Sequence, residues 1–131
     1  MKTVLSLIEA GAQQLDAAEV SYGHGTANAF DEAAWLVLWR LGLPLDALDE
    51  VAEQAVAPEG EAQVADLLAQ RIATRKPAAY LTQEAWLQGV PFYVDERAIV
   101  PRSFIAELVV DGSFDAWLGP HTQRVLDLCT G

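Results

Sequence analysis

The chain has 131 residues, of which 52% are apolar, so it is long enough for one modest domain and too apolar to be disordered. Its formal net charge is −11, and residues 1–70 hold two basic and twelve acidic side chains. Such a surface repels the phosphates of nucleic acids, which argues against direct DNA binding, and attracts basic partners. The alternative is that acidic helix faces only keep the protein soluble.

No apolar run approaches the roughly 20 residues that a membrane-spanning helix needs, so no membrane association is expected. Ser6 and Glu9 interrupt the apolar stretch at the N-terminus, which predicts an amphipathic helix and not a signal peptide. The single cysteine, Cys129, excludes an intrachain disulfide and favours the reducing cytoplasm. His24 lies among glycines with no ligand at metal-binding spacing, so it is interpreted as a loop residue and no metal site is expected.

Residues 1–75 predict a small helical bundle. Apolar residues at spacings of three and four indicate helices over about 3–18, 28–41, 45–54 and 61–74. Asn28 is expected to cap the second of these, whose apolar face consists of Phe30, Ala34, Val37, Leu38 and Leu41. Trp35 and Trp39 share one face and are interpreted as packing residues. A turn is expected over residues 57–60, which include a proline and a glycine.

Residues 76–102 predict a β-hairpin linker. Two apolar runs, 85–87 and 90–94, flank Gln88-Gly89, a pair that suits a two-residue hairpin turn. Pro91 makes the second strand an edge strand, because proline has no backbone N–H to donate. A third short strand is expected over residues 98–100.

Residues 103–131 predict a helix and then a strand. Ser103 is a candidate helix cap, and an apolar stripe follows at Phe104, Ile105, Leu108 and Val109. Residues 125–128 predict a buried strand that enters a glycine turn, which lets the backbone approach a nucleotide-like cofactor. One strand cannot form a parallel sheet, so the strand and the apolar stripe would be left bare. The chain is therefore expected either to be disordered after about residue 100 or to self-associate through this strand and helix.

The order of these segments resembles the protein-(glutamine-N5) methyltransferases, a family that modifies translation proteins. The resemblance rests on residues 22–26, 31–33, 79–82, 92–97, 99–103 and 125–131. One branch of the family acts on release factors and the other on a large-subunit ribosomal protein. The second branch is the more similar, and Cys129 fits it, since the release-factor branch usually has glycine at that position.

The resemblance implies a mainly α chain that is the N-terminal part of an enzyme. It implies a helical domain over residues 1–75, the hairpin linker over 76–102, and, over 103–131, the start of a Rossmann-like α/β methyltransferase domain. It implies that the parent enzyme uses S-adenosylmethionine, and it assigns cofactor contacts to Asp127, Cys129, Thr130, Gly131, Pro101 and Arg102. The family's Asn-Pro-Pro-Tyr motif does not occur in the sequence. No catalytic residue is therefore expected in this chain, and no cofactor binding by this chain alone.

The resemblance and the charge together predict that residues 1–75 recognise a basic ribosomal protein substrate, because opposite charges steer the encounter. A release-factor glutamine methyltransferase is one alternative. A DNA adenine methyltransferase is another, against which the acidic front half argues. A helical interaction module without enzymatic activity is an alternative from another class.

Overall fold

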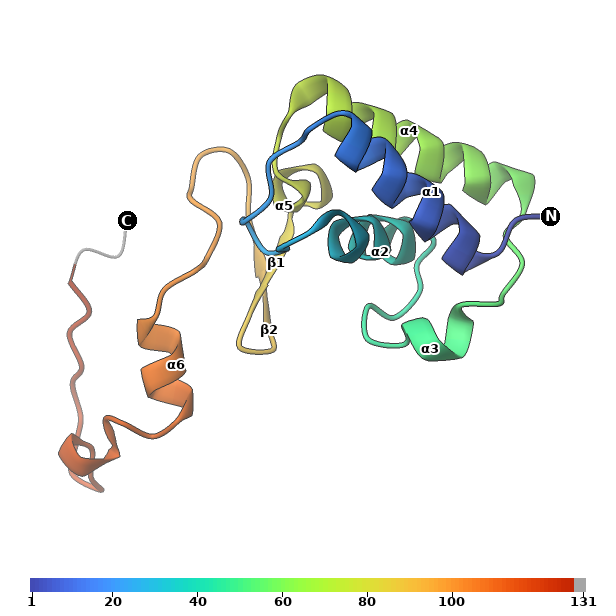
Figure 1. Ribbon diagram of the computed structural model, residues 1–131. Coiled ribbons are helices and arrows are strands. Elements are labelled where there is room, and N and C mark those ends of the chain that lie inside the picture. The colour runs from blue at the N-terminus through green and yellow to red at the C-terminus, as the bar shows by residue number, and fades with distance from the viewer. Residues whose placement is uncertain (129–131) are drawn as a thin grey trace.

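A computed structural model describes residues 1–128 of the chain (Figure 1). About half of this part is helical, and it holds one antiparallel pair of strands, so the chain is mainly α as predicted. The elements, in order, are α1 Val4–Ala17, α2 Ala29–Arg40, α3 Leu48–Val51, α4 Pro58–Thr74, α5 Ala78–Thr82, β1 Glu84–Leu87, β2 Val90–Tyr93, α6 Ile105–Val110 and the 3-10 helix η1 Asp115–Trp117. None of these helices has the length and apolar character needed to cross a bilayer.

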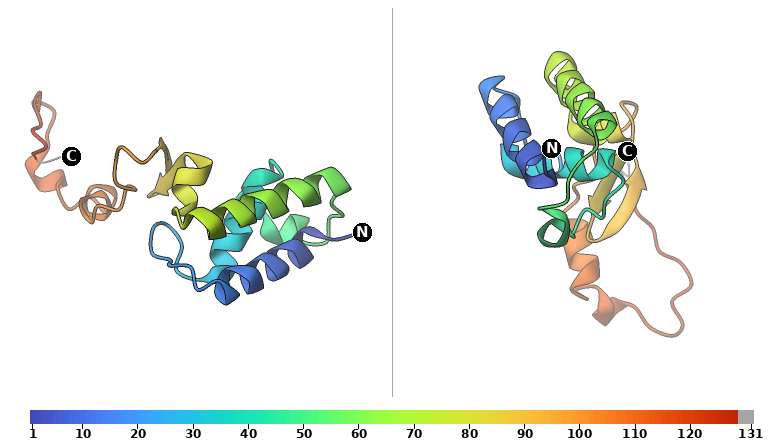
Figure 2. Two further views of the ribbon diagram at one scale, coloured as in Figure 1. Left: turned by 90° about the horizontal axis from the view of Figure 1, so that it is seen from above. Right: turned by 90° about the vertical axis from the view of Figure 1, so that its right-hand side faces the viewer.

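The helices α1, α2 and α4 form a bundle that contains the main core (Figures 1 and 2). Gly11 lets α1 approach α4, because a Cβ at this position would lie 3.1 Å from Cδ1 of Leu68. Burial of the apolar faces stabilises the bundle by the hydrophobic effect. The most deeply buried core side chains are Val4, Ile8, Leu15, Ala33, Leu36, Val37 and Leu38.

Side chains cap the first two helices of the bundle. Thr3 and Ser6 form a capping box, in which each hydroxyl accepts the backbone N–H of the other residue, at 3.2 Å and 2.9 Å. Oδ1 of Asn28 accepts the backbone N–H of Asp31 at 2.8 Å, which confirms the predicted cap of α2. These bonds satisfy backbone donors that have no partner within the helix.

Three details of the helical region differ from the predictions. Residues 57–60 are not a free turn, because α4 already begins at Pro58, which occupies the first helical turn, where its missing N–H costs nothing. The short helix α3 spans four residues, fewer than expected. Phe30 is 40% exposed and does not belong to the core, since the buried face of α2 is rotated toward Ala33 and Leu36.

The predicted hairpin is confirmed. β1 and β2 pair antiparallel, with Leu87 opposite Val90, and Gln88-Gly89 connects them. Both connecting residues have positive φ, +50° and +74°, which is the backbone geometry of a type I′ turn. Ala85 on β1 is buried with Val94 and Val100 in a small second core.

Neither of the other two predicted strands forms. Residues 98–100 are irregular, and the carbonyl of Ala98 accepts the hydroxyl of Tyr80 at 2.7 Å instead of pairing with a strand. Residues 125–128 form no strand either, and Val125 and Leu126 are each 80% exposed. An extended segment becomes a strand only when a neighbour accepts and donates its hydrogen bonds. No described residue offers that neighbour at either place.

The helix predicted after residue 103 is confirmed, but its N-cap is Phe104 and not Ser103, so the predicted cap is wrong. The hydroxyl of Ser103 accepts the backbone N–H of Ile105 at 3.2 Å, at the start of α6. α6 and η1 lie beyond the hairpin, away from the helical bundle (Figures 1 and 2). Most of the apolar side chains of α6 are exposed, Phe104 before it at 82% and Val110 at 65%.

Candidate functional site

A buried ion pair fixes the loop that precedes α2. Nε of Arg71 donates to Oε2 of Glu32 at 2.9 Å, and the two residues are 1% and 3% exposed. Nη2 of Arg71 also donates to the carbonyl oxygen of Ser21 at 2.7 Å. The hydroxyl of Thr26 donates to the other carboxylate oxygen of Glu32 at 3.0 Å. Both ends of the loop between residues 21 and 26 are therefore attached to the pair, which joins α2 to α4.

Two glycines give this loop its path. Gly23 and Gly25 have φ values of +113° and +111°, a backbone conformation that residues other than glycine rarely adopt. The N–H of Gly23 donates to the carbonyl of Thr26 at 2.8 Å. A Cβ on Gly25 would lie 3.3 Å from Cζ3 of Trp35, so the loop backbone packs directly on that indole ring.

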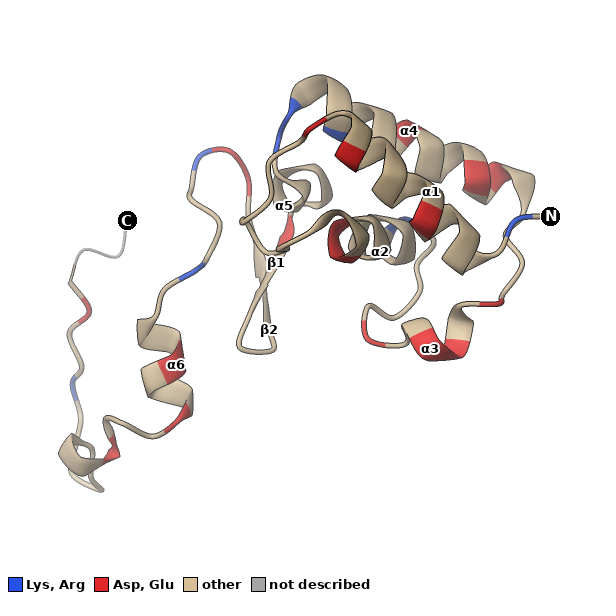
Figure 3. Cartoon of the chain, viewed as in Figure 1, with Lys and Arg blue, Asp and Glu red and all other residues tan. Residues whose placement is uncertain are grey.

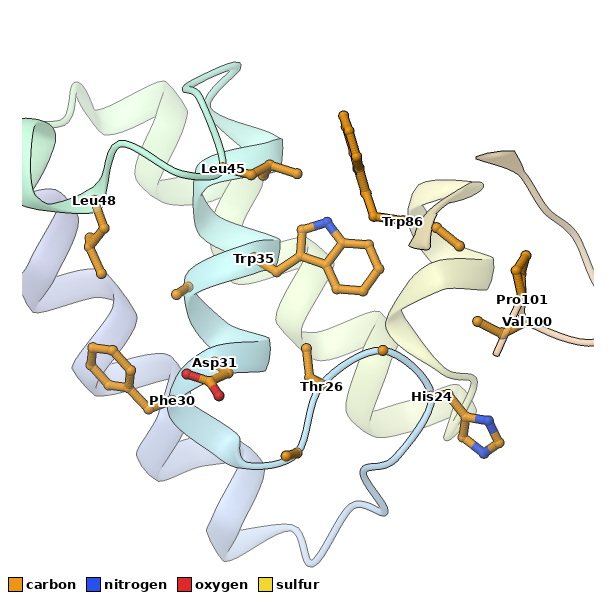
Figure 4. Close-up of a pocket in the computed structure, with 14 residues that line it drawn as sticks. His24, Thr26, Phe30, Asp31, Trp35, Leu45, Leu48, Trp86, Val100 and Pro101 are labelled. Carbon is orange, nitrogen blue, oxygen red and sulfur yellow. The ribbon is translucent and has the colours of Figure 1, made fainter. Parts of the chain in front are cut away.

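The loop forms one wall of a groove with a volume of about 570 Å³. The other walls come from the first half of α2, from the segment that leads to α3, and from β1, with Val100 and Pro101 at one end (Figure 4). Groove-lining residues are His24, Gly25, Thr26, Ala27, Phe30, Asp31, Ala34, Trp35, Leu45, Leu48, Ala85, Trp86, Val100 and Pro101. Most of them are apolar, which is typical of a binding groove.

Trp35 connects the two cores of the molecule. Its ring packs against the bundle core and also against the small core of the hairpin, so its predicted packing role is confirmed. Its Nε1 is buried, however, and donates to no acceptor among the described residues. A buried donor without a partner costs roughly 1–3 kcal/mol. Figure 4 shows that this nitrogen lies on the side of the ring that faces Leu45 and Trp86.

The charge around the groove is negative. Asp31 lines it and is exposed, and Asp46 and Asp49 stand next to the lining residues Leu45 and Leu48 in the sequence. No lysine or arginine lines it. Acidic side chains are spread over the bundle helices and α3, with few basic ones between them (Figure 3). The groove therefore combines apolar walls with one acidic side chain, that of Asp31.

A second hollow, of about 390 Å³, lies between α5 and the segment after β2, beside Tyr80 and residues 95–97. Its charges are already paired: Nη2 of Arg97 lies 2.7 Å from Oδ2 of Asp95, and Nζ of Lys76 lies 2.7 Å from Oε1 of Glu96. Hydrogen bonds from Arg97 hold the pKa of the Asp95 carboxyl well below its usual range. These contacts hold the turn after the hairpin and leave no free charge for a ligand.

The structure describes three of the residues predicted to contact a cofactor, Pro101, Arg102 and Asp127. Pro101 lines the groove, whereas Arg102 and Asp127 are exposed and hydrogen-bond to no described residue. Cys129, Thr130 and Gly131 lie outside the described residues. The described part of the chain, residues 1–128, contains no cluster of three His, Cys, Asp or Glu residues that could bind a metal ion.

The groove and the ion pair were not predicted from the sequence. Arg71 does carry a signal, because it follows Val64, Leu67 and Leu68 at helical spacing on the buried face of α4. A charged residue on an apolar stripe indicates a buried partner. Nothing local indicates that the partner is Glu32, which lies 39 residues away, or that Trp86 would stand beside Trp35.

No model of a protein family matches the chain. Curated proteins named "ribosomal protein uL3 glutamine methyltransferase" match 99–100% of its length. The chain is 48% identical to the one from Bordetella pertussis and 46% identical to the one from Burkholderia pseudomallei. It is 43% identical to the one from Xanthomonas campestris pv. campestris. The chain covers 44%, 43% and 42% of these proteins, so it spans less than half of their length.

Proposed function

We propose, from the premise that this chain belongs to the ribosomal protein uL3 glutamine methyltransferase family, that it is the substrate-recognition part of such an enzyme. The whole enzyme would transfer a methyl group from S-adenosylmethionine to the side-chain amide nitrogen of a glutamine in a large-subunit ribosomal protein, in the cytoplasm. The observation that carries this proposal is the match of the entire chain to relatives named for that activity. Their greater length leaves room for the catalytic part.

The chemistry supports a division of labour between this chain and the rest of the enzyme. An amide nitrogen is a poor nucleophile, because its lone pair is delocalised into the carbonyl group. A catalyst has to orient it with fixed hydrogen-bond acceptors, which is catalysis by positioning and by oriented dipoles. The family's Asn-Pro-Pro-Tyr motif would supply those acceptors, and it is not in this sequence. Recognition is then the role left for residues 1–75, with residues 76–102 as the linker.

The acidic surface supports recognition of a basic protein. Among the first seventy residues, ten of the twelve acidic side chains are exposed; Glu32 is buried and Glu61 is partly buried. Their summed field attracts a positively charged substrate and raises the rate of encounter. The same field repels nucleic acid, so a free ribosomal protein fits this surface better than one covered by ribosomal RNA.

Residues 103–131 would begin the catalytic part. We assign Asp127, Cys129, Thr130 and Gly131 to the loop beside the cofactor, and Pro101 and Arg102 to a segment near it. S-adenosylmethionine, when bound, would supply the methyl group. The exposed apolar residues of α6 are the feature that supports this assignment, since such a surface normally packs against another surface. The sheet of a Rossmann-like domain would cover it, or a second copy of the chain.

The test uses the full-length protein that contains this chain. It is incubated with S-adenosylmethionine and, separately, with unmethylated uL3 and unmethylated release factors, and mass gains are mapped to residues. One methyl group on a glutamine of uL3 is expected. A methyl group on a release factor instead would move the protein to the other branch, and no transfer to either substrate would favour an interaction module without activity.

Charge variants test the recognition role. Asp46→Asn, Asp49→Asn and Glu50→Gln together should raise the KM for uL3 at low salt and leave the KM for S-adenosylmethionine unchanged. The matched control changes three exposed acidic residues of the C-terminal segment, Glu107, Asp111 and Asp115, in the same way. Because surface electrostatics are screened within about 10 Å at 0.1 M salt, the difference between the two variants should shrink as salt rises. Equal KM values at low salt would contradict the role.

A further inference from the structure

We propose that the groove between α2 and the hairpin binds an extended segment of the ribosomal protein substrate, with an apolar side chain next to a lysine or arginine. This inference rests on the proposed function and names the place at which the substrate is held. Three features of the groove support it: an unpaired donor, apolar walls of suitable size and an unpaired negative charge.

The unpaired donor is Nε1 of Trp35. It is buried, faces Leu45 and Trp86, and has no acceptor among the described residues (Figure 4). Buried polar groups in folded proteins nearly always have a partner, so an exception calls for a ligand or a water molecule. An extended peptide presents a backbone carbonyl at every residue. It can supply the acceptor once the side chain of Trp86, which is 48% exposed, turns away from the buried nitrogen. The indole N–H would then fix the register of the bound segment.

The apolar walls have the size for a short segment and not for one side chain alone. The groove volume of about 570 Å³ lies within the roughly 300–1,000 Å³ of sites that bind small molecules or short peptides. Phe30 is 40% exposed and Trp86 48% exposed, and both line the groove. Large aromatic residues on the rim of a groove are the anchors that bind apolar side chains of a partner.

The charge selects a basic segment. Asp31 is exposed, lines the groove and forms no ion pair with a described lysine or arginine. In the second hollow, by contrast, the carboxylates of Asp95 and Glu96 are already paired with Arg97 and Lys76. Oδ2 of Asp31 accepts a hydrogen bond from Nδ2 of the neutral Asn28 side chain at 2.8 Å. A lysine or arginine of the substrate can therefore bind at Asp31 without displacing an internal cation. A phosphate or an acidic peptide would be repelled.

The experiment measures methyl transfer and indole N–H shifts in the full-length protein. Trp35→Phe keeps an aromatic ring and removes the donor, and Trp39→Phe is the matched control, since Trp39 lies one turn further along α2 and does not line the groove. Trp35→Phe should raise the KM for uL3 roughly three- to tenfold, the loss expected for one buried hydrogen bond. The kcat and the KM for S-adenosylmethionine should not change, and Trp39→Phe should behave as the wild type.

A second variant keeps the test valid if Trp35→Phe folds poorly. Asp31→Asn should raise the KM for uL3 roughly two- to fivefold at low salt and less at high salt. Glu107→Gln, which neutralises an exposed carboxylate on α6, is its control and should leave that KM unchanged. In the wild-type protein, the indole ¹⁵N–¹H signal that Trp35→Phe removes should shift downfield when uL3 is added, because the N–H gains an acceptor.

The outcomes separate this inference from the proposed function. If the wild type methylates uL3 but Trp35→Phe and Asp31→Asn match their controls, the groove does not bind the substrate and the proposed function stands. If the indole signal of Trp35 already lies downfield, at the position of a hydrogen-bonded N–H, before uL3 is added and does not move afterwards, another part of the protein occupies the groove and the inference is wrong. If the wild type does not methylate uL3, the proposed function fails and this inference fails with it.

Discussion

The helical bundle and the C-terminal segment contain the same kinds of apolar side chain and expose them very differently. Ile8 on α1 is fully buried, whereas Ile105 on α6 is 57% exposed. Both lie in apolar stripes at helical spacing, so the local pattern does not distinguish them. The difference lies in what each stripe faces: α1 has α2 and α4 beside it, and α6 has no such neighbour among the described residues (Figure 2). An apolar stripe therefore predicts a need for burial, and the partner surface has to be found elsewhere.

The largest expected effect is the loss of stability when the buried ion pair of the bundle is broken, which would show that contacts within the bundle stabilise it. Glu32→Ala leaves the Arg71 guanidinium buried without its carboxylate, and removing one partner of a buried pair costs roughly 3–5 kcal/mol. Urea unfolding, followed by circular dichroism, should therefore show a large loss in the free energy of unfolding. Because Thr26 and Ser21 are attached to this pair, the loop before α2 should also lose protection from hydrogen exchange.

The double variant Glu32→Leu with Arg71→Met is the control for this prediction. It removes both charges and leaves neither unpaired, so it should recover most of the stability that Glu32→Ala loses. A single variant as stable as the wild type would mean that water reaches the pair, and the bundle would then be less tightly packed than its 1% and 3% exposures indicate.

One substitution made in both regions tests the comparison directly. Ile8→Ala should lower the free energy of unfolding by roughly 2–5 kcal/mol, because it leaves a cavity in a packed core. Ile105→Ala in residues 1–131 should change it by at most about 0.5 kcal/mol, as exposed positions usually do. Denaturant midpoints of the two variants measure the difference. In the full-length protein, Ile105→Ala should become clearly destabilising if the rest of the enzyme covers α6, and it should stay neutral if nothing does.

The sequence predicted most reliably the features that depend on a few adjacent residues. Asn28 caps α2 and Gln88-Gly89 connects the strands because capping and tight turns are decided by local side chains and local φ values. The predictions failed where the local structure depends on a partner that is distant in the sequence. Residues 98–100 and 125–128 have strand-like composition but form no strand, since none of the described residues pairs with them. The start of α4 at Pro58 was missed because proline was interpreted as a turn residue and not as the first residue of a helix.

The groove could not be predicted from the sequence for the same reason. Its walls come from residues 24–27 of the loop, from α2, and from the hairpin some fifty residues later, and no local pattern joins these segments. Trp35 was predicted to pack in the core, which is true of its ring. Its unpaired nitrogen becomes visible only when the surroundings of the ring are known. The resemblance to the family, in contrast, rests on short motifs distributed over the whole chain, which is why the sequence alone indicated it.

The smallest expected effect is the difference in stability between alanine variants of the two loop glycines. This difference distinguishes backbone strain from contact with Trp35. Gly23 and Gly25 have nearly equal φ values, so alanine should strain both backbones to a similar extent, by about 1–3 kcal/mol. Only at Gly25 does the new methyl group meet a neighbour, the ring of Trp35 at 3.3 Å. The Gly25→Ala protein should therefore be less stable than the Gly23→Ala protein by a few tenths of a kcal/mol in urea unfolding.

The kinetic difference between these two variants should exceed the difference in stability. A methyl group that pushes on Trp35 changes the position of the groove's donor, whereas the same backbone change at Gly23 meets no atom within 4 Å. If the full-length protein methylates uL3 as proposed, Gly25→Ala should thus raise its KM for uL3 severalfold, and Gly23→Ala should leave that KM close to the wild-type value. If both variants raised the KM for uL3 equally, the backbone conformation of the loop, and not its contact with Trp35, would determine substrate binding. The ion pair of Glu32 and Arg71, to which both ends of the loop are attached, would then determine the shape of the groove.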